Sequence, residues 1–272
     1  ITCFFVPPDK EYLGYFDYST LICLFCMLAV VAGLKSTNVF ELISRKLIGL
    51  FHTRRAVIYA LVFGTFFFDM IVANDMSLIT FLPLTYIVLH STKNDKYLAF
   101  TFIMQTIAAN MGGMITPYGN PQNLYLYSYY NINTTEFFSI LLIQSITVAV
   151  LLWICCAFIH NEPLKLRKNS KIIISKKELY IYSILFILVI LSIFRVIPYL
   201  ITLAIVVLTI LIVDRKMFKQ IDYALIATFF VFFIFSGNIA RIPAIKEFIS
   251  EIVVKNTLLA GIVSCQFISN VP

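Results

Sequence analysis

The stretch at residues 110–123 reads NMGGMITPYGNPQN and interrupts a long apolar segment. Pro117, Gly119 and Pro121 cannot continue a regular helix, because proline lacks the amide hydrogen and glycine is a poor helix former. The whole segment 98–130 is long enough for only one membrane crossing. We therefore predict that this helix breaks inside the bilayer, where unwound backbone must be buried in protein or line a wet cavity.

The composition of the chain indicates a membrane protein. Of its 272 residues, 60% are hydrophobic and 13% are charged, which is more apolar and less charged than a typical soluble domain. Apolar runs of about 20 residues recur without polar alternation, which favours helices over a β-barrel. We predict an all-α polytopic membrane protein whose solvent is the lipid bilayer. All cysteines except Cys3 lie within apolar runs and are interpreted as apolar filler.

Charged residues are distributed unequally among the loops. Residues 35–55, 91–97, 160–178 and 214–222 are rich in lysine and arginine, so the positive-inside rule places them in the cytoplasm. The acidic stretch 8–16 suits the outer side. These basic loops account for the net charge of +7, which therefore does not indicate nucleic-acid binding. We expect a multi-pass protein of the cell membrane, and specifically of a bacterial inner membrane.

The same order of segments occurs twice. A span, an amphipathic helix and a hairpin with a polar tip follow one another in each half, from opposite sides by the charge count. Many secondary transporters use such an inverted repeat around a mid-membrane site. The chain starts and stops within this pattern, so we expect a fragment cut at both ends. The predicted parts are a first repeat at 1–160 (interfacial helix 37–54, hairpin 56–90, broken helix 98–130, span 137–159), a cytoplasmic loop at 161–178, and a second repeat at 179–272, truncated in its hairpin.

The first hairpin consists of two apolar arms with Asn74 and Asp75 between them. Basic residues flank both ends, so both ends are expected in the cytoplasm. Two complete spans satisfy the charge rule equally well. The strongly polar pair, without a polar loop around it, favours a re-entrant hairpin.

The broken helices predict a binding site within the membrane. A helix that begins there presents unpaired N–H groups and the positive end of its dipole, which attract anions without any lysine or arginine. Helix ends expose carbonyl groups, which together with amide and hydroxyl oxygens suit Na⁺. The alternative is that the polar residues only cap the helix ends. The candidate residues are Asn74, Asp75, Thr116, Asn120, Gln122 and Asn123, with Gly119 in the turn.

Asp75 is the only acid at a proposed hairpin tip. Its carboxylate suits Na⁺ or a proton, and a capping role on the second arm is the alternative. We predict a Na⁺ site at Asn74, Asp75 and Asn120. Asp69, in the first arm, is expected to face the same cavity or to pair with a missing segment. Arg195, between two spans, is expected to extend toward the outer surface.

These residues resemble motifs of the ion transporter superfamily. That group includes arsenical pump membrane proteins, NhaD-type sodium/proton antiporters, citrate/proton carriers and sodium-coupled dicarboxylate carriers. Asn74-Asp75, followed by LITF at 78–81 and by Pro83, looks like its first hairpin signature. Residues 110–123 look like the broken helix that follows, and the resemblance covers nearly the whole chain.

The tip Ser269-Asn270 looks like the second hairpin of that superfamily. The resemblance implies that these two residues line the site, as Ser-Asn-Thr tips do in dicarboxylate carriers. Val271 replaces the threonine here, so the arsenical-pump and anion-permease branch is the closer likeness. The family resemblance also allows a homodimer.

Together these features predict secondary active transport of a small inorganic or organic anion, coupled to Na⁺ or H⁺, with no other cofactor. A sodium/proton antiporter with Asp75 as carrier and a non-transporting membrane subunit are the alternatives. An enzyme is not expected, because the spans contain no HExxH, GxGD or Ser/His pair.

Overall fold

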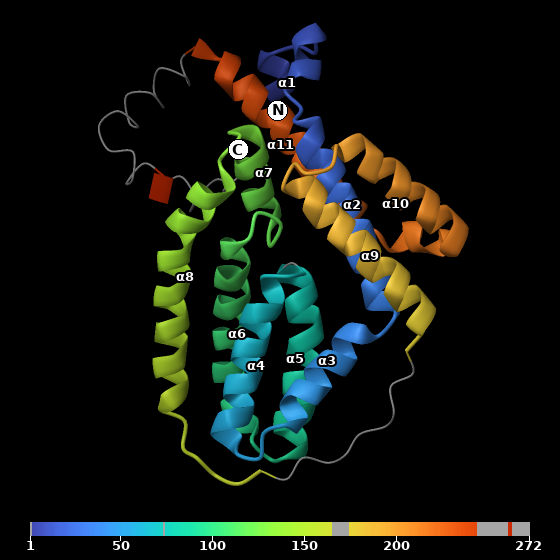
Figure 1. Ribbon diagram of the computed structural model, residues 1–272. Helices are drawn as coiled ribbons and strands as arrows, with labels where there is room; N and C mark the ends of the chain where they lie inside the picture. The colour runs from blue at the N-terminus through green and yellow to red at the C-terminus, as the bar shows by residue number, and fades with distance from the viewer. Residues whose placement is uncertain (1, 73, 165–173, 244–260, 263–272) are drawn as a thin grey trace.

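The computed structural model describes residues 2–72, 74–164, 174–243 and 261–262. Within these ranges the regular elements are helices, apart from one antiparallel bridge between Thr53 and Pro163, which confirms the all-α class. The α-helices are α1 (Thr2–Phe5), α2 (Tyr18–Ser36), α3 (Val39–Gly49), α4 (Arg54–Asp69), α5 (Asn74–Ser91), α6 (Leu98–Gly112), α7 (Pro121–Tyr129), α8 (Thr134–Ala157), α9 (Lys176–Ile193), α10 (Tyr199–Val213) and α11 (Tyr223–Arg241), shown in Figure 1. Short 3-10 helices at Lys10–Gly14, Asp95–Tyr97, Gly113–Ile115 and Arg215–Gln220 complete the list.

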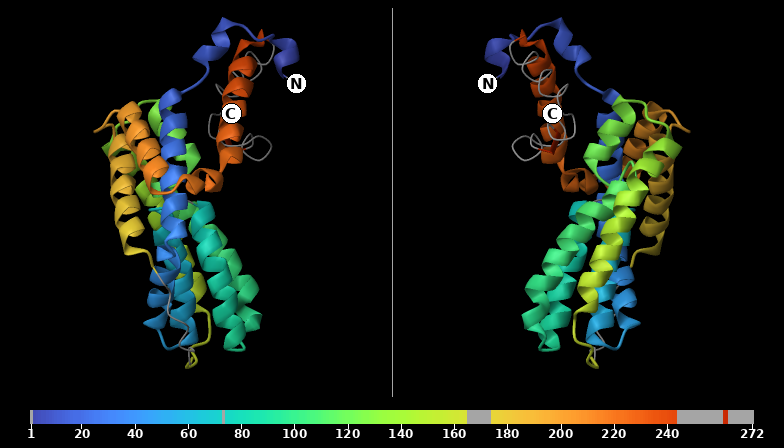
Figure 2. Two further views of the ribbon diagram at one scale, coloured as in Figure 1. Left: turned by 90° about the vertical axis from the view of Figure 1, so that its right-hand side faces the viewer. Right: turned by 90° about the vertical axis from the view of Figure 1, so that its left-hand side faces the viewer.

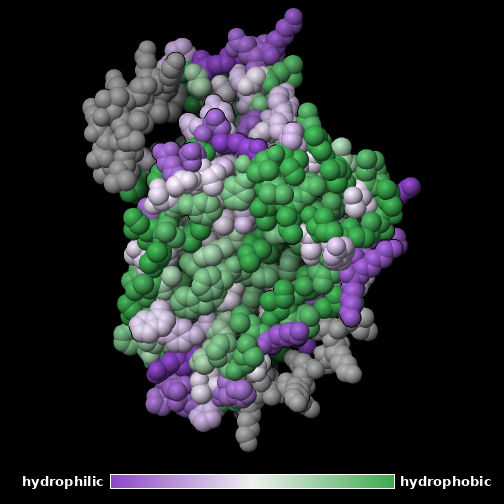
Figure 3. Space-filling view, viewed as in Figure 1, coloured by the Kyte–Doolittle hydropathy of each residue, from purple (hydrophilic) through white to green (hydrophobic). Residues whose placement is uncertain are grey.

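The surface of the protein suits a bilayer. Within the described ranges, four stretches are long and apolar enough to cross a membrane: Tyr18–Ser36, Asp95–Ile115, Thr134–Ala157 and Tyr223–Arg241. In Figure 3, apolar residues dominate the middle of the visible face, and hydrophilic residues gather toward its upper and lower ends. On α8, Ile143 and Trp153 are 70% and 58% exposed. Apolar surface of this extent is favourable only against lipid, so the chain is a polytopic membrane protein.

Helices α4 and α5 form an antiparallel hairpin whose turn lies beside the break between α6 and α7 (Figure 1). The arms contain 16 and 18 residues, which corresponds to about 24 and 27 Å of helix at 1.5 Å per residue. Both lengths fall short of the roughly 30 Å of hydrocarbon that a full span must cross. These lengths favour the re-entrant hairpin over two complete spans.

Helix α3 is shorter than the interfacial helix expected at 37–54, because the chain turns at Leu50 and Arg54 already belongs to α4. Its apolar face is divided between two environments. Phe40 is buried edge-on against Phe68 of α4, with ring centroids 5.0 Å apart. Ile43 remains 48% exposed. The helix therefore packs partly on the hairpin and keeps apolar side chains available to lipid.

A buried polar network joins the hairpin to α6. The Gln105 amide nitrogen donates to Thr65 Oγ1 at 3.0 Å, and the Gln105 amide oxygen accepts from Thr85 Oγ1 at 2.9 Å. All three side chains are fully buried and come from α6, α4 and α5. Inside a bilayer, a polar group of this network without a hydrogen-bond partner would destabilise the folded protein by several kcal/mol. The network therefore fixes the relative register of the three helices.

At the opposite end from the basic loops, the N-terminal segment is bound to the end of α11, and the two lie side by side away from the main bundle (Figure 2). The Arg241 guanidinium contacts Asp9 Oδ2 at 2.6 Å and donates to Tyr15 Oη at 2.9 Å. This guanidinium holds the pKa of Asp9 below its usual range. The contact connects the N-terminal segment to the C-terminal end of α11.

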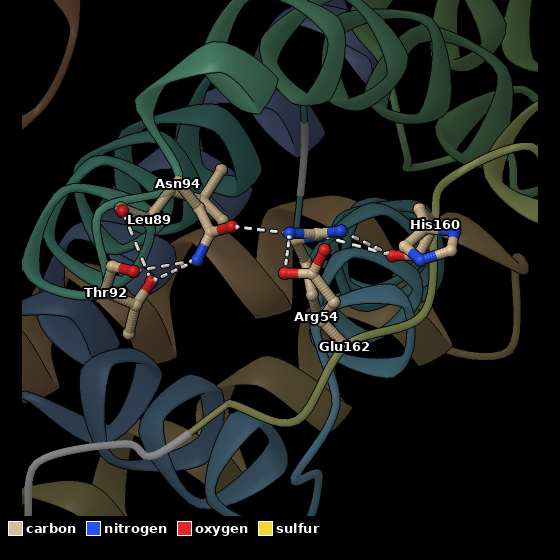
Figure 4. A network of polar contacts seen from close by, with 6 residues as sticks. All are labelled: Arg54, Leu89, Thr92, Asn94, His160 and Glu162. Atoms are coloured by element: carbon tan, nitrogen blue, oxygen red, sulfur yellow. Dashed lines mark hydrogen bonds and ion pairs between the residues drawn. The ribbon is translucent and has the colours of Figure 1, made fainter.

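At the basic end, Arg54 is the centre of a polar network (Figure 4). Its side chain is almost fully buried at the start of α4 and lies over the ring of Tyr97, 4.6 Å from the centroid. It donates to Asn94 Oδ1 at 3.1 Å, to Glu162 Oε2 at 2.7 Å and to the His160 carbonyl at 2.8 Å. The guanidinium lowers the pKa of Glu162. Arg54 thus fastens the bases of the hairpin, α6 and α8 to one another.

Replacing Arg54 by glutamine is expected to lower the melting temperature of the full-length protein by several degrees. The reason is that hydrogen bonds to charged groups contribute about 1.5–3 kcal/mol each when buried. Lys46→Gln removes the same charge from an exposed site on α3 and is expected to change the melting temperature little. Thermal unfolding in detergent, followed by tryptophan fluorescence, measures both.

The pH dependence provides a second measurement on the same pair of variants. The folded-state pKa of Glu162 is lowered, so the ion pair stabilises the protein above the ordinary glutamate pKa and is lost as pH falls through the lowered value. The difference in melting temperature between wild type and Arg54→Gln is expected to become smaller as the pH falls through that acidic interval. A melting-temperature difference that does not change with pH would contradict the role assigned to Arg54. Equal melting temperatures for Arg54→Gln and Lys46→Gln would contradict it as well.

Candidate functional site

The interruption predicted between the two halves of the broken helix is confirmed. Helix α6 ends at Gly112 and continues as one 3-10 turn, and Thr116 is extended with φ −100° and ψ 145°. Helix α7 begins at Pro121 in the first position, where the missing amide hydrogen costs nothing. Asn120 caps it, since its Oδ1 accepts from the Asn123 N–H at 2.7 Å.

The carbonyl groups at the end of α6 are held by one side chain. The Asn123 amide nitrogen donates to the carbonyls of Met114 at 2.7 Å, Thr116 at 3.1 Å and Gly113 at 3.3 Å. Asn123 is 8% exposed. These are the carbonyls that the sequence assigned to Na⁺. The Asn123 amide engages one lone pair of each, which fits the capping alternative and leaves their role in ion binding a prediction.

Close backbone packing attaches the break to the hairpin. The Thr116 hydroxyl donates to the Met70 carbonyl, just beyond the end of α4, at 2.9 Å. A Cβ at Gly112 would overlap the Phe66 carbonyl of α4, and one at Gly119 would overlap the Gly113 carbonyl. Only glycine permits these approaches. The hairpin tip and the break thus form one rigid structure.

A cavity of about 530 Å³ opens beside this structure. Its size is in the usual range of small-molecule sites. One wall comes from α2 and is apolar, and the others come from the starts of α5 and α7 and from the segment that leads into α11. The lining residues are Leu24, Met27, Leu28, Val31, Ala32, Val72, Asn74, Met76, Leu78, Ile79, Tyr118, Asn120, Pro121, Gln122, Leu124, Gln220, Asp222 and Leu225.

Three of the predicted polar residues, Asn74, Asn120 and Gln122, meet in this cavity. The Asn74 amide nitrogen donates to Asn110 Oδ1 at 2.9 Å. Its Oδ1 is buried and has no hydrogen-bond partner within the described part of the chain. An unpaired buried oxygen costs about 1–3 kcal/mol, so this atom is available to a bound ion, water or donor.

The other predicted residues have different positions. Thr116, Gly119 and Asn123 hold the cavity wall from behind and do not line it. Asp69 is fully buried and lies against Gly113 rather than in the cavity. Asp75 belongs to the first turn of α5, and its side chain is outside the described atoms. The predicted residues Ser269 and Asn270 lie outside the described residues.

Two lining residues were not anticipated, namely Gln220 and Asp222. Both fall in the stretch 214–222 that the charge pattern assigned to a cytoplasmic loop. Asp222 Oδ1 accepts from the Leu225 N–H at 3.0 Å and so caps α11. An acid directly before an apolar run predicts this cap, but nothing local in the sequence predicts its place in the cavity. Among the residues that the structure describes, the lining contains no lysine, arginine or histidine.

Arg195 was expected to extend toward the outer surface, and its side chain is exposed in the turn after α9. The residue has a φ of 63°. Its guanidinium donates to the carbonyls of Tyr127 at 2.6 Å and Ile132 at 3.3 Å, and it lies 4.4 Å from the Tyr127 ring centroid. A positive charge at a helix C-terminus is favourable. Arg195 therefore also caps the C-terminal end of α7, a contact that the sequence did not predict.

A helical membrane body whose hairpin tip and broken helix meet at a polar cavity has the architecture of a membrane transporter. The chain belongs to the citrate transporter (CitMHS) family, whose model matches residues 2–272. An uncharacterized transporter of Methanocaldococcus jannaschii is 31% identical over 261 residues, covering 94% of this chain and 70% of that protein. The inner membrane protein YbiR of Escherichia coli is 24% identical, covering 99% of this chain and 73% of the relative.

A more distant similarity is to the putative transporter arsB of Dictyostelium discoideum. It is 25% identical over 169 residues, which cover 60% of this chain and 28% of that protein. The family and these relatives together establish the general function of the chain, which is membrane transport.

The glycine packing generates a prediction. Gly112→Ala is expected to abolish transport and to lower the yield of folded full-length protein, because the added methyl group would meet the rigid Phe66 backbone. Gly49→Ala is the matched control, since no atom lies within 4 Å of an added Cβ there. Size-exclusion chromatography and solute flux in liposomes measure the two effects. Normal flux in Gly112→Ala would refute the close approach of α4 and α6.

Proposed function

We propose that the full-length protein carries out secondary active transport of a small anion, coupled to Na⁺ or H⁺. The main support for this proposal is that two helices, α5 at Asn74 and α7 at Pro121, begin at the same cavity beside an apolar wall. The described chain supplies one half of the proposed site. In an inverted repeat the second hairpin and the second broken helix would supply the other half.

The anion is proposed to bind at the helix N-termini. Each N-terminus carries about half a positive charge from the helix dipole. At α7, Pro121 has no N–H, and the Asn123 and Leu124 N–H groups are bonded to Asn120, which leaves the Gln122 N–H as the donor closest to the cavity. No basic side chain belongs to the described part of the lining, so within that part the helix ends are the main source of positive potential. The apolar wall from α2 keeps the local dielectric low, which strengthens this attraction. A small inorganic oxyanion or an organic carboxylate is the class of substrate that fits.

The coupling ion is proposed to bind beside the anion. Asn74, whose Oδ1 has no partner among the described residues, lines the cavity together with Asn120, Gln220 and Asp222. The Oδ1 atoms of Asn120 and Asp222 each already accept one N–H as helix caps, and a carboxylate or amide oxygen can accept a further contact. Oxygen sets of this kind suit Na⁺. Our proposed Na⁺ ligands remain Asn74, Asp75 and Asn120, and Asp222 adds a second carboxylate. A cation held there would offset the charge of the anion and so couple the two binding events.

The relatives support the substrate class and the location. The family is described as citrate transporters, and one relative is called a putative transporter arsB. Both names fit a small anionic or oxyanion-forming substrate. The Escherichia coli relative is named an inner membrane protein, which supports the bacterial inner membrane as the proposed location.

A flux measurement tests the anion proposal. The full-length protein in liposomes is screened with arsenite, sulfate, citrate and dicarboxylates, with and without Na⁺. Asn74→Ala is expected to reduce uptake of the transported solute at least tenfold, roughly the loss of one buried hydrogen bond to an ion. Asn161→Ala, which removes an exposed amide in the loop after α8, is expected to keep wild-type uptake. Equal uptake by both variants would refute a site at Asn74.

The alternative, a sodium/proton antiporter, is tested with Asp75→Asn. If Asp75 carries the proton, sodium-dependent proton movement disappears in this variant while anion uptake is retained. If the protein is an anion symporter coupled through Asp75, both activities fall together. A pH-sensitive dye inside the liposomes and isotope uptake follow the two activities in the same preparation.

A further inference from the structure

A second concavity shares one lining residue, Ile79, with the proposed transport site and extends from there to α3. It is a half-open groove of about 280 Å³ between the end of α2, helix α3 and the middle of α5. Its polar side includes Lys35, Glu41 and Arg45. Its apolar side includes Ile79, Leu84 and Ile87. The groove thus combines cationic groups with a hydrocarbon surface.

The groove is placed at the membrane interface. Lys35 is in the last turn of α2, where that span ends and the basic segment 35–55 begins. The positive-inside rule assigns this end to the cytoplasmic face. On the apolar side, Ile79 and Ile87 are 51% and 46% exposed. Side chains of this kind are favourable against acyl chains and unfavourable against water.

The charged groups of the groove are only partly satisfied. Arg45 forms an ion pair with Glu41, with Nη2 and Oε1 2.5 Å apart. Its Nε is buried and has no hydrogen-bond partner among the described residues. Lys35 is exposed and forms none of the ion pairs found in the described ranges. The three side chains leave a net charge of +1 and several unused donors.

We propose that this groove binds an anionic phospholipid of the cytoplasmic leaflet. The phosphate accepts hydrogen bonds from Lys35 and from the Arg45 guanidinium, whose side chain is 25% exposed, and an acyl chain lies along Ile79, Leu84 and Ile87. Guanidinium and ammonium groups are the usual phosphate ligands, and basic pockets at the cytoplasmic ends of membrane helices bind anionic headgroups. A soluble phosphate would satisfy the donors but leave the isoleucines uncovered.

The bound lipid would have a structural effect on the hairpin. Helix α3 contacts both α4 and α5, and the lipid would fill the remaining gap between α3 and the second arm. Because each basic residue near an anionic surface contributes about 1 kcal/mol, the two groups together predict a preference of roughly tenfold or more for an anionic over a zwitterionic headgroup.

Native mass spectrometry of the full-length protein, titrated with phosphatidylglycerol or phosphatidylcholine, tests this inference. Wild type is expected to retain phosphatidylglycerol with at least about a tenfold preference. The double variant Lys35→Gln/Arg45→Gln is expected to lose this preference. Lys46→Gln removes an exposed charge from the same helix outside the groove and is expected to retain most of it.

A further variant keeps the proposal testable if the double variant fails to fold. Glu41→Gln removes the competing carboxylate, keeps both cations and is expected to increase phosphatidylglycerol retention. Equal loss in Lys46→Gln and the double variant would overturn the proposal, because the effect would then follow net charge alone. Displacement of the lipid by inorganic phosphate at millimolar concentration would also overturn it, since the apolar side would have no role.

Discussion

The amide of Asn123 satisfies backbone that would otherwise be stranded in hydrocarbon. A helix that stops inside a bilayer leaves carbonyl groups without water to solvate them, and each such group costs several kcal/mol. Here a single amide contacts three carbonyls at the end of α6, while Asn120 caps the start of α7. Without these contacts the carbonyl groups of the break would be unpaired, and the backbone that forms one wall of the cavity would be destabilised.

The rest of the hairpin unit keeps this break in place. Gly112 brings α6 into contact with the α4 backbone, Thr116 bonds to Met70, and the buried network around Gln105 sets the helix register. As a result, Asn74 at the start of α5 and Asn120 at the start of α7 face the same cavity. These contacts between α4, α5, α6 and the break thus bring together two helix N-termini that are distant in the sequence.

The elements that depend on local chemistry could be predicted from the sequence. The prolines and glycine at 117–121 predict the break, and the alternation of apolar and basic stretches predicts the helices and their loops. Contacts between distant side chains could not be predicted in this way. The partners of Arg195 and Arg54, and the presence of Asp222 in the cavity, depend on tertiary packing that no local pattern encodes. The sequence identified Asn123 as a candidate site residue of the break. That its amide nitrogen contacts three backbone carbonyls could be seen only in the structure.

Arg195 has one more consequence. Its guanidinium joins the corner between α9 and α10 to the far end of α7, whose near end borders the cavity. Helix α9 also packs along α2, which forms the apolar wall of the same cavity. The α9–α10 pair is thus connected to two parts of the site, so a change in its position would be transmitted both to the wall and to Pro121 and Gln122 at the rim.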